Sequence, residues 1–208
     1  TAPDFTSSRE ARLFLQELSS VLQYLNVFDP NVEGSMRIDS NISLGETRVE
    51  VKNISGFKDV EKALNYEIIR QKNLLSKGKK VARETRGWDA TAGVTRSLRV
   101  KEEEEDYGYI FEADLPRITI SKGKLADIEA TIPELAEEKL ERYVKEYGIG
   151  YDLAISITSE PDLAAMFEQV IKKADAQLAA KWFAGEIKKT LNYNNLRMKD
   201  TKIKSEHI

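Results

Sequence analysis

The chain has 208 residues, of which 41% are hydrophobic and 32% charged, and its formal net charge is −3. This composition supplies enough apolar side chains for one large or two smaller packed domains, which excludes global disorder. Cysteine is absent, so disulfides, thiolate nucleophiles and cysteine zinc sites are excluded. The single histidine, His207, lies at the end of the chain, which argues against a Ser-His-Asp triad or a histidine metal site.

Membrane spans and secretory signals are not found in the sequence. No run approaches the roughly 20 apolar residues that a membrane span requires. The first residues have neither the basic nor the apolar region of a secretory signal, and they lack an initiator Met. We therefore expect an internal piece of a larger soluble protein of the cytoplasm.

Two long helices are predicted in the first half of the chain. Ser7 and Glu10 have the spacing of a capping box, and apolar residues at helical spacing follow over about 8–25. A second helix is predicted over 58–77, with Gly78 placed to end it.

Strands are predicted between and after these helices. Residues 36–44 and 48–52 alternate between apolar and polar side chains around a turn, which predicts a β-hairpin. Further strands are predicted around 81–88, 94–100 and 117–121. Strands interleaved with long helices indicate an α/β or α+β sheet whose apolar side is covered by the helices.

The rest of the chain, past residue 122, is predicted to be helical because its apolar residues recur with a period of 3.6. A capping box at Thr131 and Glu134 predicts the start of one helix, which Gly148 ends. Two more helices are predicted to begin at Ser159 and Asp175. The domains that we predict are residues 1–125 and 126–208.

The predicted hairpin has one apolar face and one densely charged face. Opposed side chains of an antiparallel pair lie within about 5.5 Å, so two polar rows should face each other. These rows are Arg37, Asp39 and Asn41 on one strand and Arg48, Glu50 and Lys52 on the other. Such a layer supplies carboxylates for a hard metal ion and cations for a phosphate group. The alternative is a solvated outer face with cross-strand salt bridges.

Other signals are weaker. Gly78-Lys79-Lys80 lacks the upstream glycine and the Ser or Thr of a P-loop, and no GxGxxG follows a strand. Aromatic residues near basic ones indicate either base stacking or a buried core, and these are Trp88, Tyr107, Tyr109 and Phe111. Basic residues gather from 70 to 101 and near the C-terminal end, where they either contact nucleic acid or form a solvated surface.

Several motifs resemble one family. Residues 33–43, EGSMRIDSNIS, resemble a motif of the B subunit of the tRNA-dependent amidotransferases. The match continues in order through VEVKN at 49–53, Glu67 with Arg70-Gln71, ETR at 84–86 and Thr95, and it extends into the helical half. The resemblance implies an archaeal-type B subunit that lacks the first half-cradle and the C-terminal tail domain. The fold that it implies is α+β, with a mixed or antiparallel cradle-like sheet, helices on one face and an all-helical domain after it.

The resemblance also implies an activity. The B subunit is expected to use ATP and Mg²⁺ to phosphorylate the side-chain carboxylate of Glu-tRNA(Gln) or Asp-tRNA(Asn). Ammonia from a glutaminase partner, the A subunit, then gives the amide, within a cytoplasmic heterotrimer that also contains the small C subunit. The competing interpretation is a non-catalytic module of the same pathway that binds tRNA or assembles subunits.

Site residues follow from the resemblance together with the polar face. The expected catalytic residues are Arg37, Asp39, Glu50 and Lys52. Among these, Asp39 and Glu50 are expected to hold the metal ion, while Arg37 and Lys52 stabilise phosphate charge. The residues expected to bind the cofactor ATP are Arg86, Arg99 and Lys101.

Overall fold

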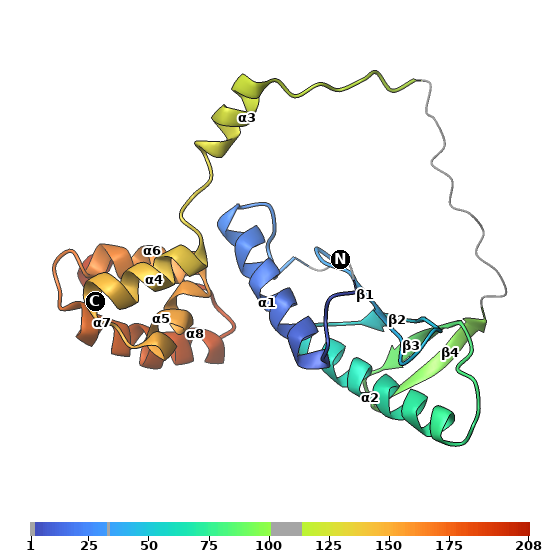
Figure 1. Cartoon of the computed structure of the whole chain (residues 1–208). Helices are drawn as coiled ribbons and strands as arrows, with labels where there is room; N and C mark the ends of the chain where they lie inside the picture. The colour runs from blue at the N-terminus through green and yellow to red at the C-terminus, as the bar shows by residue number, and fades with distance from the viewer. Residues whose placement is uncertain (1–2, 33, 101–113) are drawn as a thin grey trace. The chain divides into compact units, whose positions relative to one another are not determined.

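Two compact units make up the computed structural model of the chain, which describes residues 3–32, 34–100 and 114–208. Unit 1 comprises Thr1–Glu17 and Pro30–Ile120, and unit 2 comprises Leu18–Asp29 and Ser121–Ile208. Unit 1 contains the sheet, and the described part of unit 2 consists of helices and their connections (Figure 1). The expected α+β class is confirmed. The domain boundary between residues 125 and 126 stays a prediction.

A mixed sheet of four strands forms the centre of the described part of unit 1. In spatial order the strands are β1 (Ile38–Ile42), β2 (Val49–Ile54), β3 (Glu84–Asp89) and β4 (Val94–Val100). The outer pairs, β1–β2 and β3–β4, are antiparallel, whereas β2 and β3 are parallel. Parallel strands need a crossover connection, and helix α2 (Phe57–Ser76) provides it.

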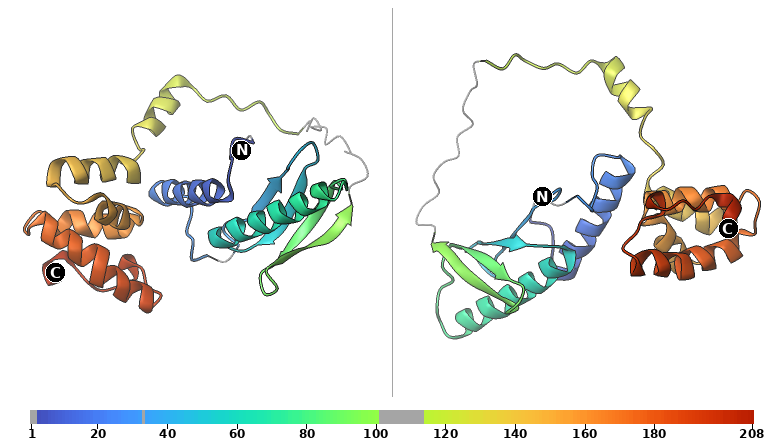
Figure 2. Two further views of the ribbon diagram at one scale, coloured as in Figure 1. Left: turned by 60° about the horizontal axis from the view of Figure 1, so that its bottom comes forward. Right: turned by 180° about the vertical axis from the view of Figure 1, so that it is seen from behind.

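Helices cover one face of this sheet. Helix α2 lies along the sheet (Figure 2), and the start of helix α1 (Ser8–Tyr24) packs into the same core. The core of unit 1 contains Ala11, Val51, Ile54, Val60, Ala63, Leu64 and Trp88. Both predicted helices are therefore confirmed, and Gly78, with a φ of 66°, follows the end of α2 as expected. Trp88 is a core residue, and the other three aromatic candidates lie outside the described residues.

A β-bulge in β2 interrupts its pairing with β1. The ladder pairs on either side of the bulge are Ile38 with Ile54 and Ser40 with Val51. Asp39 therefore opposes two residues, Lys52 and Asn53. Asn53 has a φ of 62°, a backbone conformation that asparagine adopts more readily than most residues with a Cβ.

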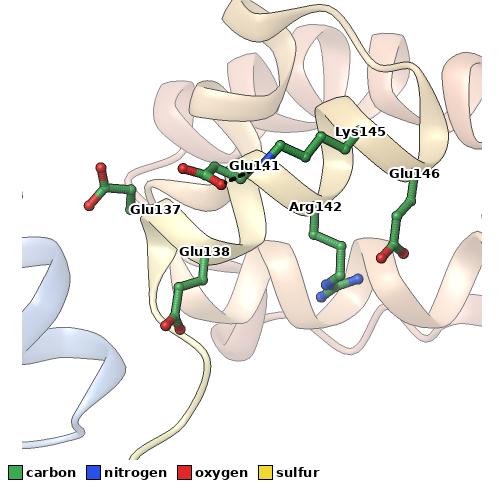
Figure 3. A pocket seen from close by; sticks show the side chains of 6 residues that line it. All are labelled: Glu137, Glu138, Glu141, Arg142, Lys145 and Glu146. Carbon is green, nitrogen blue, oxygen red and sulfur yellow. Dashed lines mark hydrogen bonds and ion pairs between the residues drawn. The ribbon is translucent and has the colours of Figure 1, made fainter.

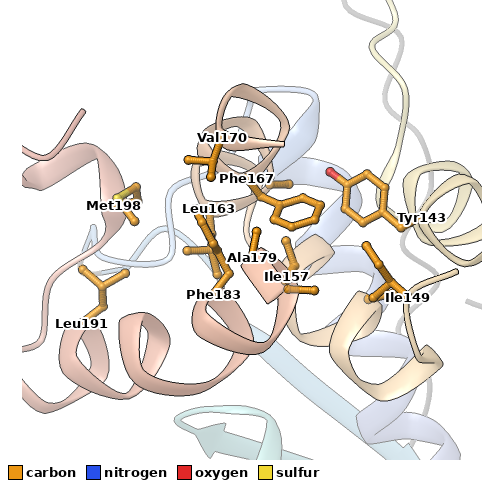
Figure 4. Close-up of a cluster of buried hydrophobic side chains, with 13 residues drawn as sticks. Tyr143, Ile149, Ile157, Leu163, Phe167, Val170, Ala179, Phe183, Leu191 and Met198 are labelled. Atoms are coloured by element: carbon orange, nitrogen blue, oxygen red, sulfur yellow. The ribbon is translucent and has the colours of Figure 1, made fainter. Parts of the chain in front are cut away.

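Unit 2 packs short helices around an aromatic core. The helices that contribute to this core are α4 (Ala136–Tyr147), α5 (Tyr151–Thr158), α6 (Pro161–Val170), α7 (Ala176–Trp182) and α8 (Lys188–Tyr193), with a π-helical turn (Phe183–Ile187) joining α7 to α8, whereas α3 (Lys122–Glu129) has no buried residue. The ring of Phe167 lies 5.1 Å from that of Tyr143 and 5.4 Å from that of Phe183 (Figure 4). All three side chains are fully buried. None of the helices in the described residues is both long and apolar enough to span a membrane.

Three expectations about local structure are wrong. Residues 117–121 alternate as a strand would, but they pair with no strand among the described residues and stay exposed. Helix α4 begins at Ala136, because Glu138 accepts the N–H of Leu135 at 3.0 Å, whereas Thr131 donates to the carbonyl of Ile128 after α3. Helix α6 begins at Pro161, because Ser159 still belongs to the end of α5. The cap at Asp175 is confirmed, since its carboxylate accepts the N–H of Leu178 at 2.8 Å.

Candidate functional site

The charged face of the hairpin forms a connected cluster of side chains. Lys52 Nζ lies 3.3 Å from Asp39 Oδ2 and 3.2 Å from Glu50 Oε1. Arg37 Nη2 lies 3.3 Å from the same oxygen of Asp39. The structure therefore brings together the four residues expected to be catalytic, whose roles stay predictions. We call Arg37, Asp39, Glu50 and Lys52 the polar-face cluster.

Strand alternation and the pairing register of β1 with β2 place these side chains. Glu50 and Lys52 alternate along β2 with Val49 and Val51, whose side chains are fully buried on the helix side, so the two charged residues project from the opposite face. The antiparallel register of β1 and β2, in which Asn41 pairs with Glu50 and Ser40 with Val51, places Asp39 opposite Lys52. Strand β3 adds Thr85, whose hydroxyl donates a hydrogen bond of 2.9 Å to Glu50 Oε2. Both oxygens of the Glu50 carboxylate therefore have a partner.

The cluster stays charged and reachable from solvent. Hydrogen bonds with Glu50 and then Asp39 hold the pKa of Lys52 above its ordinary value, so Lys52 is an ammonium ion at neutral pH. The Arg37 side chain is 75% exposed, whereas that of Glu50 is only 19% exposed. A ligand that approaches this face meets the guanidinium of Arg37 first and the better-shielded carboxylates of Asp39 and Glu50 behind it.

The cluster has donors of the type that Mg²⁺ uses. Among the described residues, no group of three or more Asp, Glu, His or Cys side chains is arranged to hold a metal ion. Mg²⁺, however, is usually bound through one or two carboxylates, with water and substrate phosphates completing its shell. Asp39 and Glu50 both contact the one ammonium of Lys52, so both carboxylates reach a common cation. Their number and chemistry fit this mode of binding.

The residues expected to bind ATP are not brought to this cluster. Arg86 lies on the helix-covered face of the sheet, since it pairs with Val51 in the parallel register and contacts Glu67 of α2. The backbone of Arg99 pairs with Thr85, but its side chain lies outside the described part of the structure. Lys101 also lies outside the described residues. Nucleotide binding by these three residues stays a prediction.

A second polar cluster is buried between α2, β3 and β4. We call it the Glu67 cluster, and it contains Glu67, Arg70, Gln71, Glu84, Arg86 and Thr95. Glu67 has no exposed surface, and its Oε1 lies 2.9 Å from Arg70 Nε and 3.1 Å from Arg86 Nε. Thr95 donates a further hydrogen bond to the same oxygen. Burial raises the pKa of Glu67, but the hydrogen bonds from Arg70 and Thr95 outweigh it, so the pKa is lower than usual.

The sequence motifs contain Thr85 and the members of the Glu67 cluster, but sequence reasoning predicted neither the contact of Thr85 with Glu50 nor the buried cluster. Glu67 lies three residues after Leu64 and four before Gln71, so it occupies the buried stripe of α2. An acid within an apolar stripe is the signal that could have predicted a buried partner, because buried carboxylates are paired. The face of Thr85 and Arg86 depends on the register between β2 and β3, which the sequence pattern does not determine.

Comparison with known proteins places these clusters in a family. Residues 1–126 match the family described as "GatB/GatE catalytic domain". The chain belongs to this family.

Family relatives share similarity well beyond the matched domain. Three of them are B subunits of aspartyl/glutamyl-tRNA(Asn/Gln) amidotransferases. The relative from Methanosarcina barkeri is 48% identical over 200 residues, which cover 95% of this chain and 40% of the relative. The relative from Halobacterium salinarum is 44% identical over 96% of this chain and 43% of the relative. The relative from Thermotoga maritima is 40% identical over 100% of this chain and 45% of the relative. The chain thus spans less than half the length of these relatives, and the resemblance to the amidotransferase B subunit is confirmed.

The side chains of the ETR segment (residues 84–86) of this GatB/GatE domain point to both faces of the sheet. Glu84 and Arg86 point to the helix side, where Arg86 Nη1 lies 2.8 Å from Glu84 Oε1. Thr85, between them, points to the polar-face cluster and bonds Glu50. Three consecutive residues therefore connect the Glu67 cluster to the polar-face cluster.

Outside the family match, a shallow hollow lies on helix α4. Its lining residues are Glu137, Glu138, Glu141, Arg142, Lys145 and Glu146 (Figure 3). All of them come from one helix, and Glu141 and Lys145 pair at 2.7 Å. Such a run of charges is the ordinary solvated face of an amphipathic helix.

Three basic residues of the C-terminal end are engaged within unit 2. Arg197 Nη2 lies 2.9 Å from Asp162, and Lys199 Nζ lies 2.9 Å from Asp29. Lys188 Nζ bonds the carbonyl of Ser156 at 2.6 Å. These cations hold the end of the chain against the helices, which reduces the charge that they present to an RNA backbone.

Proposed function

We propose that this chain contributes the polar-face cluster to the active site of an ATP-dependent, tRNA-linked amidotransferase, as part of its B subunit. The reaction phosphorylates the side-chain carboxylate of Glu-tRNA(Gln) or Asp-tRNA(Asn) and then replaces phosphate with ammonia. The observation that supports it most directly is the Asp39–Lys52–Glu50 arrangement on a sheet face within the family's catalytic domain.

The chemistry needs the residue types that this cluster contains. A carboxylate is a poor acyl donor because its leaving group would be an oxide ion, and phosphorylation converts that group into phosphate. Transfer of the phosphoryl group depends on positioning and on neutralising its charge. Lys52 and Arg37 would bind phosphate oxygens of ATP, while Asp39 and Glu50 would hold Mg²⁺. The Mg²⁺ ion, when bound, supplies further neutralisation of phosphate charge.

Partners follow from the same proposal. Ammonia would come from the glutaminase partner in a cytoplasmic heterotrimer whose third member is small. The misacylated tRNA would present its amino-acid carboxylate to the polar-face cluster. Its 3′ end carries the reacting group, so the exposed position of Arg37 suits a residue that meets the incoming substrate.

One observation favours a second candidate function. Lys52 lies between two acids, which is also what a purely structural salt-bridge layer would show. In that case the chain would be a non-catalytic module that binds tRNA or assembles subunits. The two candidates differ in what happens when a carboxylate is replaced by an amide of the same shape.

The experiment supplies ammonium chloride in place of glutamine to the assembled enzyme and measures amidated tRNA. Glu50→Gln should remove amidation even when free ammonia is abundant, while size-exclusion chromatography still shows the complete complex. A catalytic role is rejected if Glu50→Gln amidates at the wild-type rate. The assembly module is rejected if the complex forms normally but amidation is lost.

A further inference from the structure

We propose that Thr85 is a positioning residue, which fixes the orientation of the Glu50 carboxylate for metal binding and phosphoryl transfer. This inference rests on the proposed function of Glu50. Thr85 itself would touch neither ATP nor the tRNA, because its side chain is only 2% exposed and lies beside Glu50 on the floor of the sheet.

The contact geometry defines one carboxylate orientation. Glu50 Oε2 accepts the Thr85 hydroxyl at 2.9 Å, and Glu50 Oε1 lies 3.2 Å from Lys52 Nζ. The last torsion of a glutamate side chain is otherwise broad, so a carboxylate without such partners rotates. Two different partners on the two oxygens therefore select a single orientation of the carboxylate plane.

The Glu67 cluster holds Thr85 itself in place. Both sequence neighbours of Thr85 are tied to α2 from the opposite face of the sheet. Arg86 Nε lies 3.1 Å from Glu67 Oε1, and Glu84 Oε1 lies 3.4 Å from Arg70 Nη2. These ion pairs are buried, and the attraction within a buried ion pair offsets its desolvation only when the geometry is good and the remaining polar atoms are hydrogen-bonded. Because the neighbours cannot slide along α2, the hydroxyl between them stays opposite Glu50.

The parallel register supports the same conclusion. Glu50 pairs with Thr85 and Lys52 pairs with Gly87, so the two charged residues of β2 lie beside a hydroxyl and a residue without a side chain. A Cβ on Gly87 would meet Asn53 Nδ2 at 3.2 Å and Leu98 Cδ1 at 3.3 Å. Of the described β3 residues on this face, Thr85 is therefore the one that offers Glu50 a hydrogen-bond donor.

Removal of the hydroxyl should loosen Glu50 without removing its charge. Partners that orient a metal-binding carboxylate typically change metal affinity or activity by about 10- to 100-fold when they are replaced. Thr85→Val keeps the shape of the side chain and deletes the donor, whereas Thr85→Ser keeps the donor and deletes a methyl group. Thr85→Ala deletes the donor without adding a methyl group beside the carboxylate, so it serves if Thr85→Val fails to fold.

The test uses the assembled enzyme with two measurements, Mn²⁺ affinity by electron paramagnetic resonance and kcat for amidation. We expect Thr85→Val to weaken Mn²⁺ binding and to lower kcat, each about 10-fold. The KM for misacylated tRNA should stay unchanged, and Thr85→Ser should restore both quantities. Thermal unfolding of each variant is the control for a general loss of structure. Such a loss would lower the unfolding temperature and raise the KM for misacylated tRNA together.

Glu50→Gln, measured in parallel, separates this inference from the proposed function. Loss of Mn²⁺ binding and kcat in Glu50→Gln with wild-type values in Thr85→Val overturns the positioning role alone. Wild-type values in both variants overturn the positioning role and the role of Glu50 together. If Thr85→Val and Thr85→Ser both lose Mn²⁺ affinity and kcat, the inference is also overturned, because Thr85→Ser keeps the hydroxyl.

Discussion

Arg86 Nε lies 3.1 Å from Glu67 Oε1, on the face of the sheet opposite to the polar-face cluster. Alternation along β3 causes this, because Arg86 and Thr85 are adjacent and point to opposite faces. Arg86 resembles a phosphate-binding residue in sequence, yet its guanidinium is occupied by Glu67, Glu84 and Thr95. Substitutions in this ion pair should therefore change the free energy of unfolding, whereas substitutions in the polar-face cluster should change the phosphorylation reaction.

Glu67→Gln should destabilise unit 1 strongly. The change removes the charge that compensates Arg70 and Arg86, and breaking a buried pair costs about 3–5 kcal/mol. Urea unfolding followed by circular dichroism gives the free energy of unfolding. The control is Glu61→Gln, whose pair with Arg12 is only partly buried and should be worth less than about 1 kcal/mol. Equal effects of the two substitutions would contradict the buried cluster.

The same cluster should show coupling between its members. Glu67→Gln and Arg86→Met, combined, should cost less than the sum of the two single changes, by about 1–3 kcal/mol. The reason is that the second change removes a charge that the first has already left without its partner. A double-mutant cycle measures this difference, and strict additivity would show that Arg86 and Glu67 do not interact.

Unit 2 should lose stability in acid through Glu134. Hydrogen bonds from Arg142 and Lys139, against the opposing effect of burial, lower the pKa of Glu134 from 4.5 to about 2. A carboxyl group with a lowered pKa stabilises the fold fully above its unfolded-state pKa, and this contribution is lost as the pH falls through the folded-state pKa. The contribution of Glu134 is therefore lost between about pH 4.5 and pH 2.

Glu134→Gln should accordingly flatten the decline of stability across that pH window. The measurement is the free energy of unfolding at a series of pH values for both proteins. Glu141→Gln is the control, because Glu141 pairs with Lys145 on an exposed helix face and should change the profile much less. The assignment fails if the Glu134→Gln and wild-type profiles are parallel from pH 6 to pH 2.

Gly148→Ala should destabilise the end of helix α4. Gly148 has a φ of 63°, and this left-handed conformation costs a residue with a Cβ about 1–2 kcal/mol. Gly123→Ala is the control, because Gly123 lies in the first turn of helix α3 without a positive φ, so alanine there should favour the helix slightly. Urea unfolding should thus show opposite signs for the two changes. A loss of stability in both would contradict the assigned backbone conformations.

Binding of this chain to tRNA should be weak and sensitive to salt. Contacts to the RNA backbone neutralise phosphates, and each one contributes a log–log salt slope of about −0.7 to −0.9. The net charge of −3 and the internal pairing of Arg197 and Lys199 reduce the positive charge available for such contacts. We expect a Kd of about 10⁻⁴–10⁻⁶ M, the range of non-specific binding. Tight binding that does not change between low and high salt would place a recognition surface on this chain.

The hairpin could be predicted from the sequence because a period of two determines which side chains share a face. This is why Asp39 and Lys52 were expected side by side, although the bulge that follows this pair at Asn53 was not expected. The face of Arg86 could not be predicted, since it depends on how β3 pairs with β2 across the α2 crossover. Strand 117–121 was predicted wrongly for a related reason, because alternation alone does not supply a neighbouring strand.

The central claim is that the carboxylates of the polar-face cluster take part in phosphorylation of the aminoacyl side chain. The most direct measurement is formation of ADP from ATP that depends on misacylated tRNA, in the assembled enzyme without any ammonia source. Asp39→Asn and Glu50→Gln should each lower this rate by about 100-fold or more, while glutamine hydrolysis by the glutaminase partner, measured in a separate assay, persists. Asp59→Asn, which removes a carboxylate paired with Lys62 on α2, should leave the rate unchanged. Wild-type rates of ADP formation in both Asp39→Asn and Glu50→Gln would contradict the claim.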